Sequence, residues 1–144
     1  MERKIKLTID SNPSNIPFLA GALNKLCSFV PLSDVESYQV EVSAVEAVNN
    51  AIEHAYDNKP GCIIEVVFTL RPDKLTLDIC DFGRMMEYES QTSLEFDPHD
   101  LINIPVRGMG LFIVKSIMDE VSYRSDQGKN ILTMTKFLIT KGNP

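Results

Sequence analysis

The chain has 144 residues, of which 44% are hydrophobic and 24% charged, and its formal net charge is −6. This length and composition are those of a globular protein, and we expect one domain over residues 1–144. The negative charge argues against a direct nucleic-acid partner, which needs a basic face. No run approaches the about 18 apolar residues of a membrane span, and the N-terminus lacks the apolar core of a signal peptide. We therefore expect a cytoplasmic protein outside the membrane, with its three cysteines as buried free thiols.

The predicted elements begin with a strand over residues 3–9, where apolar and polar residues alternate. Apolar residues at helical spacing then predict a helix over residues 18–30, which a proline ends. Ser33 and Glu36 have the spacing of a capping box, and a long helix is predicted behind them over residues 34–56.

The second half of the chain is predicted to be rich in hairpins. Strands over residues 61–70 and 74–82 are joined by the turn sequence RPDK. A long loop over residues 83–107 has no clear periodicity and is expected to be functional. A helix over residues 110–121 and a hairpin over residues 122–139 complete the chain. This order predicts an α+β fold: a two-layer sandwich of a mostly antiparallel mixed sheet with three main helices on one face.

The long predicted helix contains the unusually polar sequence EAVNNAIEHAY, residues 46–56. At about 100° per residue, one stripe is expected to face the core: Tyr38, Val42, Val45, Asn49, Ile52 and Tyr56. A polar stripe lies beside it: Glu46, Asn50, Glu53 and Asp57. Groups at the edge of the core face can be half-buried in a cleft, although the same pattern also suits a solvated acidic flank. His54 points further round and is interpreted as a surface histidine.

Two other segments carry candidate ligand-binding residues. Asp81 ends an apolar strand, and Gly83 beyond it allows a ring or a backbone to come close, although Asp-x-Gly is also a common turn. Arg107, Gly108 and Gly110 open a helix, where N–H groups and the dipole bind anions; a glycine-permitted loop entry is the alternative. Together with the amide and carboxylate of the long helix, which suit Mg²⁺, these segments fit one nucleotide laid across the sheet.

In this order the three motifs resemble the Bergerat-type, histidine-kinase-like ATPase superfamily, and within it the anti-sigma-factor serine kinases. EAVNNAIEHAY resembles the N-box of that group, DFG its first glycine box and RGMGLFIVKSIMDEV its second. The resemblance implies a general base, Glu46, and a Mg²⁺ ligand, Asn50. It implies that further residues bind ATP: Asp81 and Gly83 at the adenine, and Arg107, Gly108 and Gly110 at the phosphates.

The function that the resemblance implies is that of an ATP-dependent serine protein kinase acting as an anti-sigma factor. Such a kinase phosphorylates a serine of a STAS-type antagonist protein and sequesters a sigma factor, often as a homodimer. Two residues depart from the family pattern. Met85 stands where the first box usually has a second glycine, and Asn130 where a threonine often supports the adenine. They leave open the alternative of a nucleotide-binding, partner-switching module without phosphoryl transfer.

Overall fold

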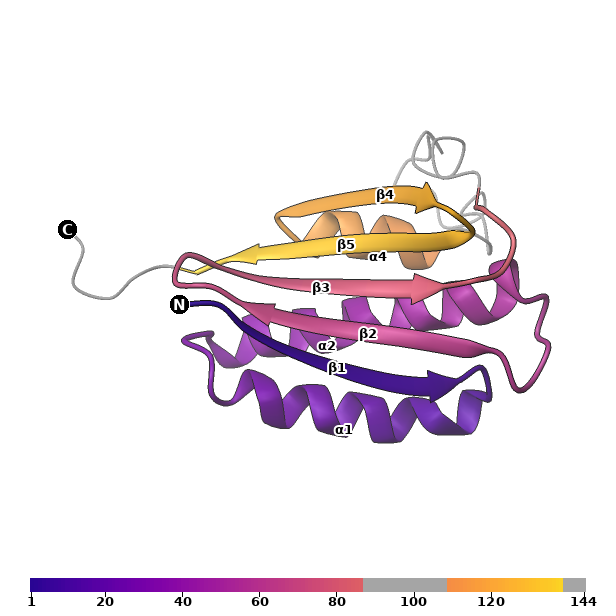
Figure 1. Cartoon of the computed structure of the whole chain (residues 1–144). Coiled ribbons are helices and arrows are strands. Elements are labelled where there is room, and N and C mark those ends of the chain that lie inside the picture. The colour runs from indigo at the N-terminus through magenta and orange to yellow at the C-terminus, as the bar shows by residue number, and fades with distance from the viewer. Residues whose placement is uncertain (87–108, 139–144) are drawn as a thin grey trace, which may run out of the picture.

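The computed structural model describes residues 1–86 and 109–138 and shows two layers, a sheet and a set of helices on one of its faces (Figure 1). The sheet has the order β1-β2-β3-β5-β4, and each of these pairings is antiparallel. Its strands are β1 (Arg3–Asp10), β2 (Ile63–Leu70), β3 (Lys74–Asp81), β4 (Glu120–Asp126) and β5 (Lys129–Phe137). The helices are α1 (Ile16–Cys27), α2 (Asp34–Asn50) and α4 (Met109–Ile117), with a short 3₁₀ turn, η1 (Pro13–Asn15), before α1. The predicted α+β fold is confirmed, with a more uniformly antiparallel sheet than expected.

The hydrophobic core lies between the two layers. Alternate residues of a strand point to the same face, and in β2 the inward set is Ile64, Val66 and Phe68, each at most 4% exposed. From the helices, Leu23 of α1 and Val40 of α2 are fully buried. Because α2 packs between α1 and α4, its position relative to the sheet is constrained from both sides, and so is the position of the polar residues at its end.

Local signals in the sequence define both ends of the long helix. The Ser33 hydroxyl accepts a hydrogen bond from the Glu36 N–H at 3.1 Å, and the Glu36 carboxylate accepts one from the Ser33 N–H at 2.9 Å. The predicted capping box is therefore confirmed. At its other end α2 continues into a π-helical turn, η2 (Ala51–Ala55). Asp57 and Asn58 then reverse the chain with positive φ angles of 49° and 62°.

The face of α2 that enters the core differs from the predicted one. Tyr38 was expected to be buried, but it is 65% exposed. The buried residues of α2 are mostly small: Val40, Ser43, Ala44, Ala47 and Val48. Small side chains let the helix lie close to its neighbours, whereas an amphipathic tyrosine can keep its polar tip in water. Relative to the prediction, α2 is thus rotated about its axis, and Asn50 and His54 are turned toward the end of β3. The other members of the predicted polar stripe, Glu46, Glu53 and Asp57, are not.

The last predicted helix, over residues 110–121, was too long. It ends at Ile117, and Glu120 already begins β4. Val121 pairs with Met134 of β5 across the sheet. Pairing with β5 therefore makes Glu120 and Val121 part of a strand, although their local sequence pattern favours a helix.

Three smaller expectations concern the cysteines, the membrane and the long loop. The cysteines are free; Cys27 and Cys80 are buried as predicted, but Cys62 is only half-buried. Burial raises the pKa of the Cys27 thiol to about 11, with a smaller contribution from the nearby Glu41 carboxylate. In the described ranges no helix is long and apolar enough to cross a bilayer. The predicted loop over residues 83–107 lies, after Met86, outside the described residues.

Candidate functional site

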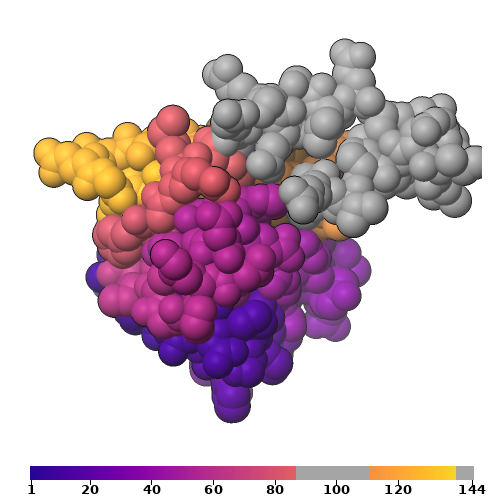
Figure 2. Space-filling view, turned by 90° about the vertical axis from the view of Figure 1, so that its right-hand side faces the viewer, coloured from indigo at the N-terminus to yellow at the C-terminus, as the bar shows by residue number. Residues whose placement is uncertain are grey.

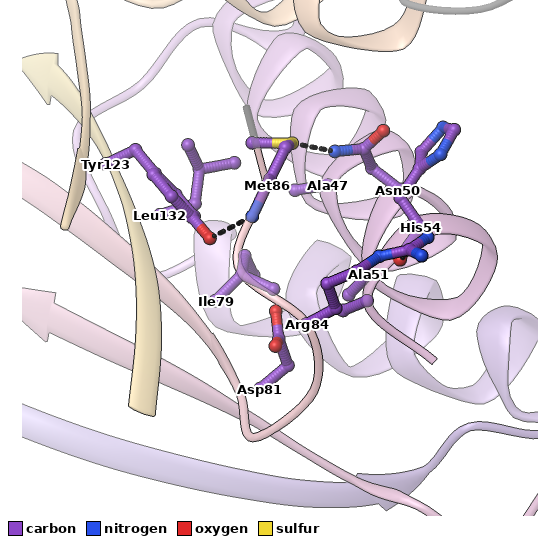
Figure 3. Close-up of a pocket in the computed structure, with 11 residues that line it drawn as sticks. Ala47, Asn50, Ala51, His54, Ile79, Asp81, Arg84, Met86, Tyr123 and Leu132 are labelled. Atoms are coloured by element: carbon purple, nitrogen blue, oxygen red, sulfur yellow. Dashed lines mark hydrogen bonds between the residues drawn. The ribbon is translucent and has the colours of Figure 1, made fainter. Parts of the chain in front are cut away.

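A small cavity lies where the end of α2, the end of β3 and the inner faces of β4 and β5 meet (Figure 3). The residues that line it are Ala47, Asn50, Ala51, His54, Ala55, Ile79, Asp81, Arg84, Met86, Tyr123 and Leu132. It is apolar at its base, and its polar groups come from several segments that are far apart in the sequence. Its free volume of about 20 Å³ holds about one water molecule. A larger ligand therefore requires the residues that cover the cavity to move.

Asp81 is the buried acid of this cavity. It is the last residue of β3 and is 7% exposed, and its side chain points from the strand into the cavity (Figure 3). Its Oδ1 accepts hydrogen bonds from the Asn130 amide at 2.7 Å and from the Gly83 N–H at 3.0 Å. Burial raises the pKa of the Asp81 carboxyl, and these two hydrogen bonds oppose the rise. Both bonds end on one oxygen, so Oδ2 is the acceptor that Asp81 offers to a ligand.

Gly83 brings the chain after β3 against the end of the long helix. The last carbonyl groups of a helix have no partner along the helix, and Ala55 is the last residue of η2. The Ala55 carbonyl accepts a hydrogen bond from the Arg84 N–H at 2.9 Å. A Cβ atom on Gly83 would lie 2.7 Å from the Ala55 carbonyl carbon and 2.8 Å from Cδ1 of Tyr56. Only glycine permits this approach, so the structure gives the predicted glycine a packing role.

Met86 covers the inner part of the cavity (Figure 3). Its sulfur accepts a hydrogen bond from the Asn50 side-chain amide at 2.8 Å, and its N–H donates to the Tyr123 hydroxyl at 2.8 Å. Burial raises the pKa of Tyr123, so its hydroxyl stays protonated at neutral pH. Met85, the residue in the place of the second glycine, is 63% exposed and is not among the described residues that line the cavity. It is the next residue, Met86, that occupies the space beside Asn50.

Arg84 closes the outer side of the cavity. Its guanidinium donates to the carbonyl oxygen of His54 at 3.1 Å and pairs with the Asp57 carboxylate at 3.0 Å. In the space-filling view the segment around residue 80, in salmon, adjoins the segment around residues 50–60, in magenta (Figure 2). Both charged groups are more than half exposed, and ion pairs of this kind contribute little stability. The ion pair between Arg84 and Asp57 therefore adds little to this closure.

The structure brings some of the predicted site residues together. Asn50 and Asp81 face the same cavity from α2 and β3. Glu46 lies one turn before Asn50 and is half-buried, and it is not among the described residues that line the cavity. Gly110 lies in the first turn of α4. Arg107 and Gly108 lie outside the described residues.

Other residues of the cavity were not found from the sequence. His54 was interpreted as a surface histidine, but it lines the cavity; its position four residues after Asn50, on the same helix face, was the available signal. Arg84 and Tyr123 belong to different segments, and nothing in the local sequence marks them. The sequence marks Asn130 only as a substitute for a threonine, and the structure shows it bonded to the buried acid.

Comparisons with known proteins agree with this geometry. The model of the histidine kinase-like ATPase domain matches residues 9–136. The serine-protein kinases RsbW of Staphylococcus aureus strains bovine RF122 / ET3-1 and MRSA252 are each 36% identical to the chain over 110 residues, which is 73% of this chain and 67% of theirs.

Solved structures with much lower identity share the fold. The RsbU and RsbW domains of Rv1364c from Mycobacterium tuberculosis align with a TM-score of 0.66 at 15% identity, over 94% of this chain and 32% of that one. A chain of the SiaB–SiaC complex from Pseudomonas aeruginosa aligns with a TM-score of 0.57 at 15% identity, over 92% of this chain and 89% of that one. The family model over residues 9–136 and the 36% identical relatives show that the chain belongs to the histidine kinase-like ATPase domain family, and within it to the serine-protein kinases of the RsbW kind.

Proposed function

We propose that this protein transfers the γ-phosphoryl group of ATP to a serine of a STAS-type antagonist protein and acts as an anti-sigma factor. The observation that carries the proposal is the meeting of Asn50 and Asp81 at one cavity, from a helix and a strand that the sequence separates. The kinship with RsbW serine-protein kinases supports the reaction type. The STAS antagonist and the sigma factor come from the family resemblance of the motifs.

Asp81 is the group that we assign to the adenine. An ionised carboxylate accepts hydrogen bonds and donates none, which suits the 6-amino group of adenine and opposes the 6-oxo group of guanine. With Oδ1 already bonded to Asn130 and Gly83, Oδ2 is the oxygen that would accept from the base. Gly83, through its close approach to the helix end, holds the chain that would lie beside the ring.

Asn50 is the residue that we assign to Mg²⁺. Its bond to Met86 uses the amide nitrogen, whereas a Mg²⁺ ligand needs the oxygen. In the described residues no group of three or more His, Cys, Asp and Glu side chains is placed to hold a metal. Mg²⁺ commonly keeps one or two protein ligands together with substrate phosphates, and a single amide fits that arrangement. When bound, Mg²⁺ would neutralise the charge of the phosphates.

Glu46 is the residue that we assign as the general base. It lies one helical turn before Asn50 on α2, and residues four apart on a helix are neighbours on its surface. In the proposed step, the serine oxygen bonds to the γ-phosphorus and the bond to the ADP oxygen breaks. The hydroxyl proton passes to the Glu46 carboxylate. We assign Arg107, Gly108 and Gly110 to the phosphates, and we propose a cytoplasmic homodimer of single domains, residues 1–144.

The experiment distinguishes the proposed role of Glu46 as general base from that of Asn50 as Mg²⁺ ligand. Transfer of labelled γ-phosphate to a serine of a STAS-type protein is measured beside direct ATP binding. Glu46→Gln is expected to retain ATP affinity and to lose transfer by about 10²–10⁴-fold. Asn50→Ala is expected to lose affinity and transfer together. Glu53→Gln is the matched control, because this acid lies on the same helix and its side chain is 60% exposed.

Two results would contradict the assignments. Undiminished transfer by Glu46→Gln would remove Glu46 from catalysis. Tight ATP binding by the wild-type protein, without transfer to any STAS-type protein offered, would replace the kinase with a partner-switching module.

A further inference from the structure

Three polar residues stand in one row across neighbouring strands at the edge of the cavity. Asp81 of β3 pairs with Asn130 of β5, and Asn130 pairs with Ser125 of β4. Directly opposed residues have their side chains on the same face of a sheet. Asn130 is 2% exposed. The register of the sheet therefore buries an amide beside the buried acid, with a hydroxyl on its far side.

The hydrogen bonds of Asn130 are taken up by the protein itself. Its Nδ2 donates to the Asp81 Oδ1 at 2.7 Å and to the carbonyl of Gly83 at 3.0 Å, with a longer contact of 3.4 Å to the carbonyl of Arg84. The Ser125 hydroxyl donates to its Oδ1 at 2.8 Å. An amide nitrogen carries two hydrogens, and both are directed at protein oxygens. Asn130 thus has no N–H left for a nucleotide.

This arrangement also determines which way the amide points. The Ser125 hydroxyl can donate only to the oxygen end of the amide, and the Asp81 carboxylate can accept only from the nitrogen end. The acceptor-only Asp81 carboxylate and Gly83 carbonyl therefore decide which way the amide points. The Ser125 hydroxyl donates to the amide oxygen and holds Asn130 in that position, and Asn130 in turn holds one oxygen of Asp81. We infer that Asn130, held by Ser125, is a positioning residue that keeps the second oxygen of Asp81 directed at the 6-amino group of an adenine nucleotide. The inference rests on the proposed function, in which Asp81 binds adenine.

The charge on Asp81 depends on the same contact. Burial raises the pKa of Asp81, and the hydrogen bond from Asn130 is the largest effect that lowers it. Among the described residues, four other titratable groups lie around the acid. The Tyr56 hydroxyl accepts a hydrogen bond from the N–H of Phe82, which follows Asp81 in the chain. Tyr123, His54 and Arg84 line the cavity. Removing the amide should raise the pKa of Asp81 further, so that a smaller fraction of the acid is ionised at any given pH.

The first experiment measures the acid directly, in protein without nucleotide. Asp81 is titrated by ¹³C NMR of its carboxyl carbon in the wild type, Asn130→Leu and Ser125→Ala. Asn130→Leu is expected to raise the midpoint by about one pH unit, the equivalent of one hydrogen bond to a charged group. Ser125→Ala is expected to raise it by less. Ser122→Ala, an exposed serine of the same strand, is the control and should leave the midpoint unchanged.

If Asn130→Leu does not fold, the Ser125→Ala variant alone tests the inference. It removes only one hydroxyl from an exposed residue, so it is expected to fold. An upward shift of the Asp81 midpoint supports the inference. An unchanged midpoint in every variant that folds overturns it. Since no nucleotide is present, this result does not depend on the proposed kinase activity.

The second experiment asks whether Asn130 acts through Asp81. The affinity for ADP with Mg²⁺ is measured by calorimetry for the wild type, Asn130→Leu, Asp81→Asn and the double variant. Asn130→Leu is expected to bind about tenfold more weakly than the wild type, and to add no loss in the Asp81→Asn background. A full additional loss in that background would overturn the positioning role. A wild-type protein that does not bind ADP would overturn the proposed function, whatever the NMR midpoints show.

Discussion

Gly83→Ala tests the close approach between the end of the long helix and the chain that follows β3. The added Cβ would lie 2.7 Å from the carbonyl carbon of Ala55 and 2.8 Å from Cδ1 of Tyr56, and closer still to the Ala55 carbonyl oxygen. Carbon atoms normally stay about 3.5–4.0 Å apart. The segment must therefore move by roughly 1 Å, because the opposing backbone belongs to a helix end that is packed on the core.

The cost of that movement can be worked out from the contacts. Overpacking a tight contact costs about 1–3 kcal/mol. The displaced segment also loses the hydrogen bond from the Arg84 N–H to the Ala55 carbonyl and the one from the Gly83 N–H to Asp81, at about 1 kcal/mol each. We expect the free energy of unfolding to fall by about 3–5 kcal/mol, and the melting temperature by roughly 10 °C or more.

The matched control is Gly21→Ala. Gly21 lies within α1, and a Cβ added there would have nothing within 4 Å. Alanine in an exposed helix interior is more stable than glycine by about 1 kcal/mol, so this variant should melt slightly above the wild type. Thermal and urea unfolding followed by circular dichroism give both values. If Gly83→Ala were as stable as the wild type, the Gly83 contact with the helix end would be refuted.

Other contacts lead to three further predictions. Met86→Ala should speed the association of a fluorescent ADP analogue in stopped-flow measurements, because the side chain that covers the cavity is gone; Met85→Ala, at a position 63% exposed, should not. Ser33→Ala removes a helix cap and should lower the free energy of unfolding by about 1 kcal/mol in urea titrations. The pKa of Glu65 is lowered from 4.5, first by a hydrogen bond from Lys6, so its stabilising contribution is present above pH 4.5 and is lost as the pH falls through the lowered pKa. Glu65→Gln should show a smaller loss of stability than the wild type over that acid range; an equal loss would refute the contribution.

The sequence by itself determined the elements and their kind, because their causes are local. Alternation marks β1, turn residues join β2 to β3, and the Ser33–Glu36 spacing begins α2, all within a few residues of chain. The motifs also predicted Asn50 and Asp81 as ligand-binding residues, and the structure places both at one cavity.

Only the tertiary structure decided how those elements face one another. The rotation of α2, which exposes Tyr38, follows from packing small residues between two helices and a sheet. The end of α4 follows from the pairing of β4 with β5. The bond from Asn130 to Asp81 joins residues 49 positions apart and exists because the β3–β5 register sets them opposite each other. Such contacts arise from the relative placement of whole elements, which no short stretch of sequence encodes.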